Sequence, residues 1–144
     1  MNMHVLVING PNLNLLGERE PEIYGADTID DCIEAVKKEM VGHEIQEFQS
    51  NSESEIIEKI QNARGTFDAI IINAGAFTHY SYAIRDALSM FNQIKIEVHL
   101  SNPHAREEFR HTSVISAVVD GVIAGFKKDS YVLAAKAVLA LREK

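Results

Sequence analysis

The chain has 144 residues, of which 46% are hydrophobic and 24% charged, and its formal net charge is −7. These values are ordinary for a globular protein, and the length is enough for one domain with a buried core. The negative charge and the lack of a Lys/Arg cluster argue against a nucleic-acid partner. No apolar run reaches the length of a membrane span. We therefore expect a single catalytic domain over residues 1–144, with neither nucleic acid nor membrane as a partner.

The single cysteine, Cys32, cannot form an internal disulfide. It lies in a helical pattern, where a packed thiol is the expected role. Residues 1–8 lack the basic segment and the long apolar stretch of a signal peptide. Both features predict a cytoplasmic protein.

A long loop follows the first apolar run. Residues 5–8 (VLVI) are typical of a strand buried on both faces. Glycines and prolines at positions 10, 11, 17, 21 and 25 then exclude a regular helix or strand. Apolar side chains give this loop a surface for docking: Leu13, Leu15, Leu16 and Ile23. We predict an active-site lid over about residues 10–25.

Hydrophobic periodicity predicts alternating helices and strands along the rest of the chain. Helices are expected over residues 28–40, 53–63, 80–91 and 130–142, and strands over residues 43–49, 67–72, 94–100 and 121–126. This alternation is typical of right-handed crossovers and a parallel sheet. With the first strand, the pattern predicts an α/β fold of the flavodoxin-like doubly wound type. Its five-stranded parallel sheet would have strand order 2-1-3-4-5 within three α/β/α layers.

Polar side chains stand at the carboxyl ends of three predicted strands. The first strand runs into Asn9 and Asn12, the third ends at Asn73, and the fourth ends at His99. Ligands bind at this edge of doubly wound sheets, so these residues predict the place of the site.

The strand over residues 94–100 carries the clearest signal. Its apolar positions alternate with Lys95, Glu97 and His99, which share one face. A central parallel strand should be apolar on both faces, and polar residues at its ligand end therefore indicate a functional site. A partly solvated strand with a surface Glu97–His99 pair would give the same pattern.

The helix over residues 80–91 adds three residues of interest. Its apolar stripe includes Tyr80, Ile84 and Leu88, which makes Tyr80 a core residue. Asp86 projects from nearly the opposite side, either as a solvated carboxylate or toward another subunit. His79, just before the helix, is either a site residue near Asn73 or a capping or merely exposed histidine.

Standard motifs for phosphate, dinucleotide, zinc and nucleophile chemistry are absent. The spacing of Glu97, His99 and His104 matches no standard metal site. We therefore expect no metal.

Together these residues predict a cleft for acid–base chemistry. Tyr24 and Arg19 lie on the loop, while His99 and Glu97 lie on a strand, so a base and an acid would be held apart. An arginine side chain can bind a carboxylate through two parallel hydrogen bonds, and two arginines follow this strand. They are Arg106 and Arg110.

Longer segments carry a resemblance to a known family. They are NGPNLNLLGEREPEIYG, NAGAFTHYSYAIRDAL and EVHLSNPHAREEFR, followed by YVLAAKAVL. In this order, and nearly end to end, the chain resembles type II 3-dehydroquinases, also called 3-dehydroquinate dehydratases, of the shikimate and quinate pathways.

The resemblance implies a cofactor-free trans elimination of water from 3-dehydroquinate, giving 3-dehydroshikimate through an enolate. Tyr24 matches the family's base, and Arg19 matches the cation that favours its phenolate form. Asn12 matches the residue that, with an ordered water, stabilises the enolate oxygen. His99 matches the general acid, and Glu97 the partner that orients it and favours its cationic form.

The resemblance also implies an oligomer and a set of binding residues. Asp86 matches a residue that reaches the neighbouring subunit's site, and the family assembles as trimers built into dodecamers. Arg106 matches a nearby supporting cation. The positions that match substrate-binding residues are Asn73, His79, Leu100, Ser101 and Arg110.

Two positions depart from the family pattern. Ala74 replaces the usual proline of an Asn-Pro-Gly-Ala turn, which loosens the φ constraint beside Asn73. Lys127 and Lys128 stand where relatives more often have a glycine.

Two other classes of protein fit parts of the sequence. A non-catalytic flavodoxin-like module that binds phosphate or a nucleotide would need a glycine- or hydroxyl-rich first loop, and residues 9–25 hold no Ser or Thr. A Schiff-base dehydratase would need a desolvated lysine in the cleft, and no lysine is well placed for that.

Overall fold

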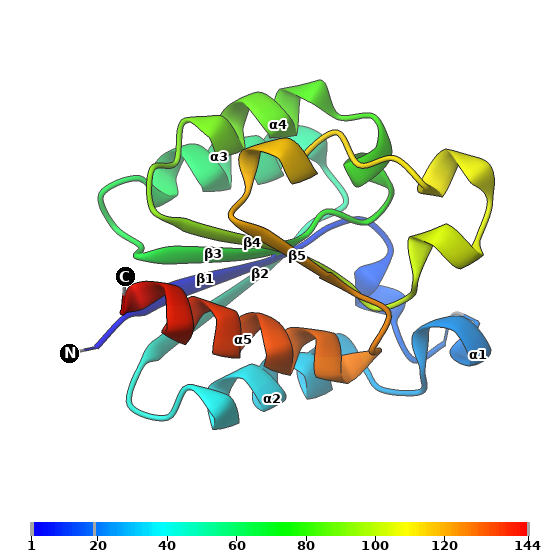
Figure 1. The fold of residues 1–144 in the computed structure, drawn as a ribbon, viewed down its shortest axis with the longest axis horizontal. Coiled ribbons are helices and arrows are strands. Elements are labelled where there is room, and N and C mark those ends of the chain that lie inside the picture. The colour runs from blue at the N-terminus through cyan, green and yellow to red at the C-terminus, as the bar shows by residue number, and fades with distance from the viewer. Residues whose placement is uncertain (1, 19, 144) are drawn as a thin grey trace.

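The computed structural model describes residues 2–18 and 20–143 and shows one parallel sheet with helices on both faces (Figure 1). The strand order is β2-β1-β3-β4-β5, and each neighbouring pair is parallel. The predicted flavodoxin-like α/β fold and its strand order are therefore confirmed.

The central strands are β1 (His4–Asn9), β3 (Ala69–Asn73) and β4 (Ile94–His99). The edges are β2 (Glu44–Gln49) and β5 (Gly121–Ala124). β3 is buried throughout and β1 nearly so. Because both faces of these strands are covered, their sequences are continuous apolar runs.

Two pairs of helices cover the sheet (Figure 1). α2 (Ile29–Glu39) and α5 (Lys128–Arg142) lie on one face, and α3 (Glu53–Ala63) and α4 (Tyr82–Ser89) lie on the other. α2 begins at a capping box in which the side chain of Thr28 accepts from the backbone N–H three residues on.

The two termini lie at one end of the sheet, and the functional loops lie at the other (Figure 1). The loop end carries the short helix α1 (Pro21–Tyr24). It also carries 3-10 turns over Leu13–Leu15, Gly75–His79, Pro103–Ala105 and Glu108–Arg110. A further 3-10 turn, Ser116–Val118, precedes β5.

The loop after β1 is docked on the protein core. Leu13, Leu16 and Tyr24 are buried in the cluster that β1, α2 and α5 form, whereas Leu15 is 49% exposed. The prediction that this loop holds no regular helix is wrong, because α1 forms one helical turn. That turn begins at Pro21, where a missing N–H and a fixed φ are tolerated. Closure of this loop as a lid stays a prediction.

Tyr80 was wrongly assigned to the core. α4 begins only at Tyr82, after a cap at Ser81, so Tyr80 lies in the preceding turn and is 57% exposed. Among the described residues, no helix has the length and apolar character needed to cross a membrane.

Candidate active site

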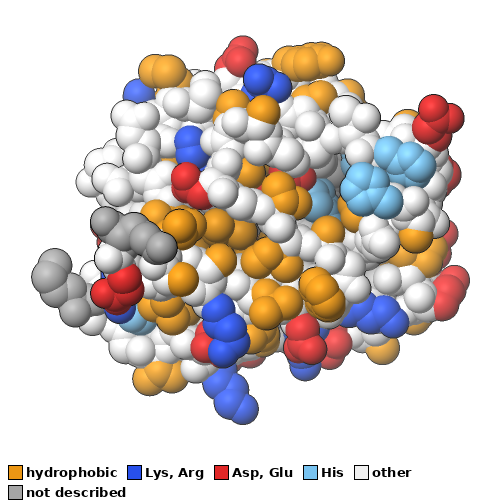
Figure 2. Space-filling model, in the orientation of Figure 1, with side chains coloured by type: hydrophobic (Ala, Val, Ile, Leu, Met, Phe, Trp, Pro, Cys, Tyr) orange, Lys and Arg blue, Asp and Glu red, His pale blue; other side chains and the backbone are white. Residues whose placement is uncertain are grey.

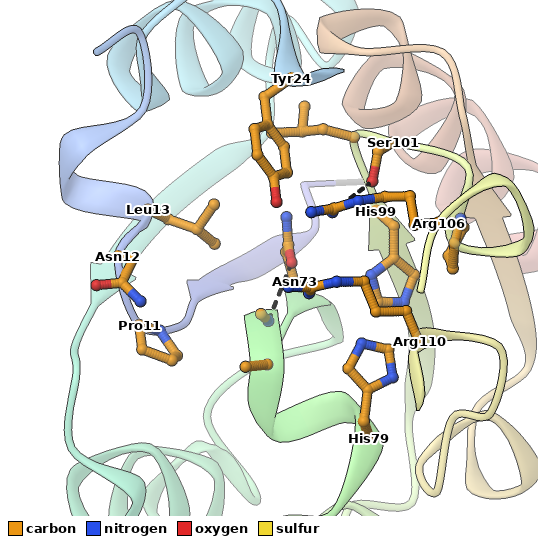
Figure 3. A pocket seen from close by; sticks show the side chains of 14 residues that line it. Pro11, Asn12, Leu13, Tyr24, Asn73, His79, His99, Ser101, Arg106 and Arg110 are labelled. Carbon is orange, nitrogen blue, oxygen red and sulfur yellow. Dashed lines mark hydrogen bonds between the residues drawn. The ribbon is translucent and has the colours of Figure 1, made fainter. Parts of the chain in front are cut away.

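A cavity of about 150 Å³ opens at the carboxyl ends of β1, β3 and β4 (Figure 3). Most of the predicted site residues line it. They are Asn12, Tyr24, Asn73, His79, His99, Leu100, Ser101, Arg106 and Arg110. The edge that the strand ends indicated is therefore where these side chains meet.

Two of the predicted residues that the structure describes are not part of the cavity wall. Glu97 is fully buried beside His99. Asp86 is exposed on α4 and lines a separate groove. Arg19 lies outside the described residues, and its role stays a prediction.

Tyr24 reaches the cavity from the loop after β1. It ends the one-turn helix α1 and is only 7% exposed. Its hydroxyl points into the cavity toward Asn73 and the guanidinium of Arg106 (Figure 3). A phenol held in this way can exchange a proton with a bound ligand.

Asn12 occupies the same loop in a left-handed conformation, with φ at 69°. Asparagine is one of the few residues other than glycine that adopt this conformation readily. The backbone N–H of Asn12 donates to Asn51 Oδ1 at 3.0 Å, which holds the turn in place. The turn sets Asn12 on the cavity wall (Figure 3).

His99, at the end of β4, is paired with the buried carboxylate of Glu97 through its Nε2. A carboxylate only accepts hydrogen bonds, so Nε2 carries a hydrogen and Nδ1 is left for other contacts. Two hydroxyls also donate to Glu97, Ser113 Oγ at 3.0 Å and Ser116 Oγ. The imidazole is therefore oriented by a carboxylate whose own position is fixed by hydrogen bonds from two serine hydroxyls.

Burial alone would raise the pKa of Glu97. The hydrogen bond and charge of His99, with the hydroxyls of Ser116 and Ser113, outweigh it and hold this pKa below its ordinary value. Glu97 has no exposed surface. The alternative of a solvated surface pair is therefore wrong.

His79 is fixed by the backbone rather than by a carboxylate. Its Nδ1 donates to the carbonyl of Thr112 at 2.8 Å, so Nε2 is the atom left for a ligand. Burial lowers the pKa of His79 against the opposing effect of that carbonyl, and nearby His99 and Arg110 lower it further. Together these effects hold the pKa of His79 below its ordinary value and favour its neutral form.

Two arginines close the cavity opposite the loop (Figure 3). Arg106 Nη1 donates to Ser101 Oγ at 3.3 Å, and Arg110 Nε donates to a Glu107 oxygen at 3.0 Å. Glu107 also lies 3.8 Å from Arg106 Nε, so one carboxylate anchors both cations. Their positive charge suits an anionic ligand.

Sequence reasoning missed the groups behind the cavity. Ser113 and Ser116 lie 16 and 19 residues after Glu97, in a stretch with no regular period. Only the rule that a buried carboxylate needs donors could have pointed to them. Tyr131, whose hydroxyl contacts Asn73, was also missed as a site residue. Asn9, which the strand end had indicated, accepts from the same hydroxyl.

Within the described residues, no three or more His, Cys, Asp or Glu side chains are grouped as metal ligands would be. The expectation of a site without metal or cofactor stays a prediction.

The fold and the cavity define a class of protein, an α/β protein whose cavity brings together phenol, imidazole and guanidinium groups. Residues 3–139 match the family described as class II dehydroquinases, and the chain belongs to this family.

Similar proteins cover nearly the whole chain. The 3-dehydroquinate dehydratase of Caldicellulosiruptor bescii is 56% identical over 142 residues, which are 96% of each chain. That of Clostridium beijerinckii is 53% identical over 139 residues, 94% of this chain and 95% of the other. The type II dehydroquinase of Butyrivibrio crossotus has a crystal structure that matches with a TM-score of 0.92 at 46% identity, covering 96% of this chain and 98% of the other. These matches do not favour the non-catalytic phosphate- or nucleotide-binding module.

Proposed function

We propose that this chain, as a single catalytic domain, removes water from 3-dehydroquinate by trans elimination and releases 3-dehydroshikimate. The observation that carries the proposal is the meeting of two proton-transfer groups from different elements in one cavity. Tyr24 comes from the loop after β1, and His99 comes from the end of β4 (Figure 3).

The first step breaks a C–H bond next to the ketone. Tyr24, as its phenolate, takes the proton, and the electron pair of that bond moves onto the ketone oxygen to give an enolate. Arg19 is the proposed cation that favours the phenolate. Asn12, with an ordered water, stabilises the negative charge on the enolate oxygen.

The second step breaks the C–O bond of the departing hydroxyl. His99 gives that oxygen a proton, so water rather than hydroxide leaves as the enolate collapses to the conjugated enone. Glu97 serves this step by holding Nε2 of His99 and orienting the ring.

The other residues of the cavity bind the substrate. Arg110 and the supporting cation Arg106 suit the substrate carboxylate. Hydroxyl groups of the substrate would meet polar groups on the facing walls. Those walls are formed by Asn73, His79, Leu100 and Ser101.

The direct test is incubation with 3-dehydroquinate while the ultraviolet absorbance of the enone product is followed. Tyr24→Phe should lower turnover at least about 100-fold, the usual share of a general base, while the substrate still binds. Tyr80→Phe is the matched control, because the Tyr80 hydroxyl is outside the cavity. No absorbance change at any wild-type concentration would overturn the function, and near-normal turnover of Tyr24→Phe would overturn its role as base.

A Schiff-base mechanism finds no support in the cavity, since no lysine is among the described residues that line it. Borohydride with substrate should therefore leave the enzyme active. A covalent substrate adduct on any lysine would reverse this conclusion.

We also propose a homo-oligomer of trimers built into a dodecamer, with Asp86 reaching the neighbouring site. Such an assembly needs two kinds of interface, and the chain exposes two apolar surfaces. One lies around Tyr82 on α4 and Met90 just after it, near Asp86. The other lies over β5 and α5 on the face that Figure 2 shows, where hydrophobic side chains gather. Its exposed members include Val122, Phe126 and Leu133.

Complementation tests the shared site. Asp86→Ala should weaken both activity and subunit association, as measured by light scattering. Co-refolding it with Tyr24→Phe chains should restore some activity, because one mixed interface then holds both intact residues. A fully active monomer, or proven mixed oligomers without complementation, would reduce Asp86 to a surface carboxylate.

The setting that fits this reaction is the shikimate pathway of aromatic amino acid biosynthesis, in the cytoplasm. A single cysteine, buried as a free thiol, supports a reducing compartment.

A further inference from the structure

A buried hydroxyl that the proposed reaction does not use lies behind the floor of the cavity. It belongs to Tyr131 on α5, whose side chain has no exposed surface. The hydroxyl lies between the carboxamides of Asn9 and Asn73, which are partners in register at the ends of β1 and β3. It accepts from Asn73 Nδ2 at 3.2 Å and donates to Asn9 Oδ1 at 2.5 Å.

The chemistry of the groups sets the direction of these hydrogen bonds. The backbone N–H of Gly75 can only donate, and it donates to Asn73 Oδ1 at 3.1 Å. Asn73 therefore turns its NH₂ group toward Tyr131, whose oxygen must accept. The hydroxyl hydrogen is then free for Asn9. Burial raises the pKa of Tyr131, so the hydroxyl keeps this hydrogen across the working pH range.

Both ends of the Asn73 carboxamide are thus fixed from outside the cavity. A 180° flip of the Asn73 amide would place its NH₂ group against the N–H of Gly75, so two donors would face each other. It would also place the amide oxygen against the Tyr131 hydroxyl, whose hydrogen is already donated to Asn9. What remains for a ligand is one N–H and the remaining acceptor capacity of Oδ1. The pattern of donor and acceptor that Asn73 offers to a substrate is set before the substrate arrives.

We propose that Tyr131 is a positioning residue, which presets the carboxamide of Asn73 for the hydroxyl groups of the substrate. This inference rests on the proposed function, in which Asn73 binds 3-dehydroquinate. Packing alone does not require the hydroxyl, since the buried positions that follow Tyr131 on α5 are apolar. They include Ala134, Ala135 and Val138. A buried hydroxyl is unfavourable unless it is hydrogen-bonded, and here both of its bonds go to strand-end amides.

The kinetic test uses Tyr131→Phe, which keeps the ring and removes only the hydroxyl. It should raise KM for 3-dehydroquinate about 10-fold, the effect of one weakened hydrogen bond, with kcat changed less than about threefold. Val138→Ala is the matched control, because it removes buried volume on the same helix at a side chain that cannot form a hydrogen bond. It should lower thermal stability and leave KM unchanged. An unchanged KM in Tyr131→Phe would overturn the proposal.

A double mutant shows whether Tyr131 acts through Asn73. Asn73→Ala alone should raise KM, and adding Tyr131→Phe should raise it no further. An equal additional rise would mean that Tyr131 acts by another route, and would overturn the proposal.

A readout without turnover separates this inference from the proposed function. The side-chain amide signals of Asn73 in an NMR spectrum, assigned with Asn73→Ala, report its hydrogen bonds directly. Tyr131→Phe should shift these signals and speed their hydrogen exchange, while Val138→Ala should not. If the wild type fails to convert 3-dehydroquinate, the function falls, and these signals still decide the role of Tyr131. Identical Asn73 signals in wild type and Tyr131→Phe would overturn it.

Discussion

The guanidinium of Arg106 lies over the ring of Tyr24, with its central carbon 4.9 Å from the ring centre. The same guanidinium is held by Ser101 and lies 4.0 Å from Glu20, which precedes the helix that carries Tyr24. Arg106 therefore links the two sides of the cavity, the loop after β1 and the loop after β4. A cation over an aromatic face is attracted by the ring.

We expect Arg106→Ala to lower kcat/KM about 10-fold, in line with about 1–2 kcal/mol for a partly desolvated cation–π contact. Arg106→Lys should recover only part of this, because an ammonium group cannot reproduce the planar contacts of a guanidinium. Steady-state kinetics measure both values. Arg142→Ala, at the opposite end of the sheet, is the control for loss of a positive charge. Wild-type kinetics in Arg106→Ala would mean that the ring contact has no role.

Glu97→Gln keeps the shape of a buried side chain and removes its charge. The carboxylate is held below its ordinary pKa, so its contribution to stability is present above the ordinary glutamate pKa and is lost as pH falls through the lowered one. We expect the unfolding free energy of wild type to fall in acid, below about pH 4, and that of Glu97→Gln to fall less.

Denaturant unfolding at several pH values measures this dependence. Glu58→Gln, an exposed position on α3, should keep the wild-type dependence. If Glu97→Gln follows the wild-type curve in acid, the pairing with His99 does not stabilise the fold. Turnover of Glu97→Gln should also fall, because an amide can donate to His99 and leave its ring misoriented.

The strands, the long helices and the place of the site could be predicted because each rests on a local pattern. Asn73 ends an apolar run and His99 ends an alternating one, and strand ends in a parallel sheet meet at one edge. The exposure of Tyr80 was not predictable in this way, because one cap at Ser81 shifts the start of α4 by two residues. The hydroxyls around Glu97 and Asn73 come from distant segments, and only the folded chain brings them there.

The departure at Ala74 is smaller in the structure than the sequence suggested. Its φ is −77°, within the range that proline adopts, so the turn after Asn73 keeps its shape without the ring. The close approach of Gly10 to Ala74 supports the same turn. A Cβ atom added at Gly10 would lie 2.5 Å from the carbonyl oxygen of Ala74.

Gly10→Ala should therefore destabilise the protein by about 2–3 kcal/mol, typical of a clash that the backbone must absorb. It should also raise KM, because the N–H of Gly10 donates to the Asn73 carbonyl at 2.7 Å. Gly121→Ala is the control, since its Cβ would meet only a methyl of Ile96 at 3.9 Å. The unfolding free energy of that variant should stay within about 1 kcal/mol of the wild-type value. Equal stability of the two variants would show that the turn yields without strain.

Cys32 should be chemically silent in the folded protein. Burial raises the pKa of its thiol to about 12, with smaller effects from Asp27 and Asp31, and the thiolate is the reactive form. A thiol reagent at pH 8 should label the chain only after unfolding in guanidinium, and Cys32→Ala supplies the blank. Because this pKa is raised, stability from the neutral thiol is present below about pH 9 and is lost as pH rises toward about 12. Rapid labelling of the native protein would contradict this.

Lys127 precedes α5 in a backbone conformation that suits glycine, with φ at 53° and ψ at −134°. Its N–H donates to the carbonyl of Leu100 at 2.9 Å. This hydrogen bond fixes the conformation beside the loop after β4. A side chain at such a φ costs about 1–2 kcal/mol. This strain gives a physical reason for the glycine that the family resemblance leads us to expect near this position.

Lys127→Gly should therefore raise the unfolding free energy by about 1 kcal/mol, even after the extra freedom of glycine in the unfolded chain. Lys127→Ala is the matched control at the same position. It removes the long side chain, which lies against Gly25, but keeps the Cβ and hence the strain. Denaturant unfolding of the three proteins at one concentration measures the difference. If Lys127→Ala stabilises as much as Lys127→Gly, the gain comes from losing the lysine side chain, and the backbone at this position is not strained.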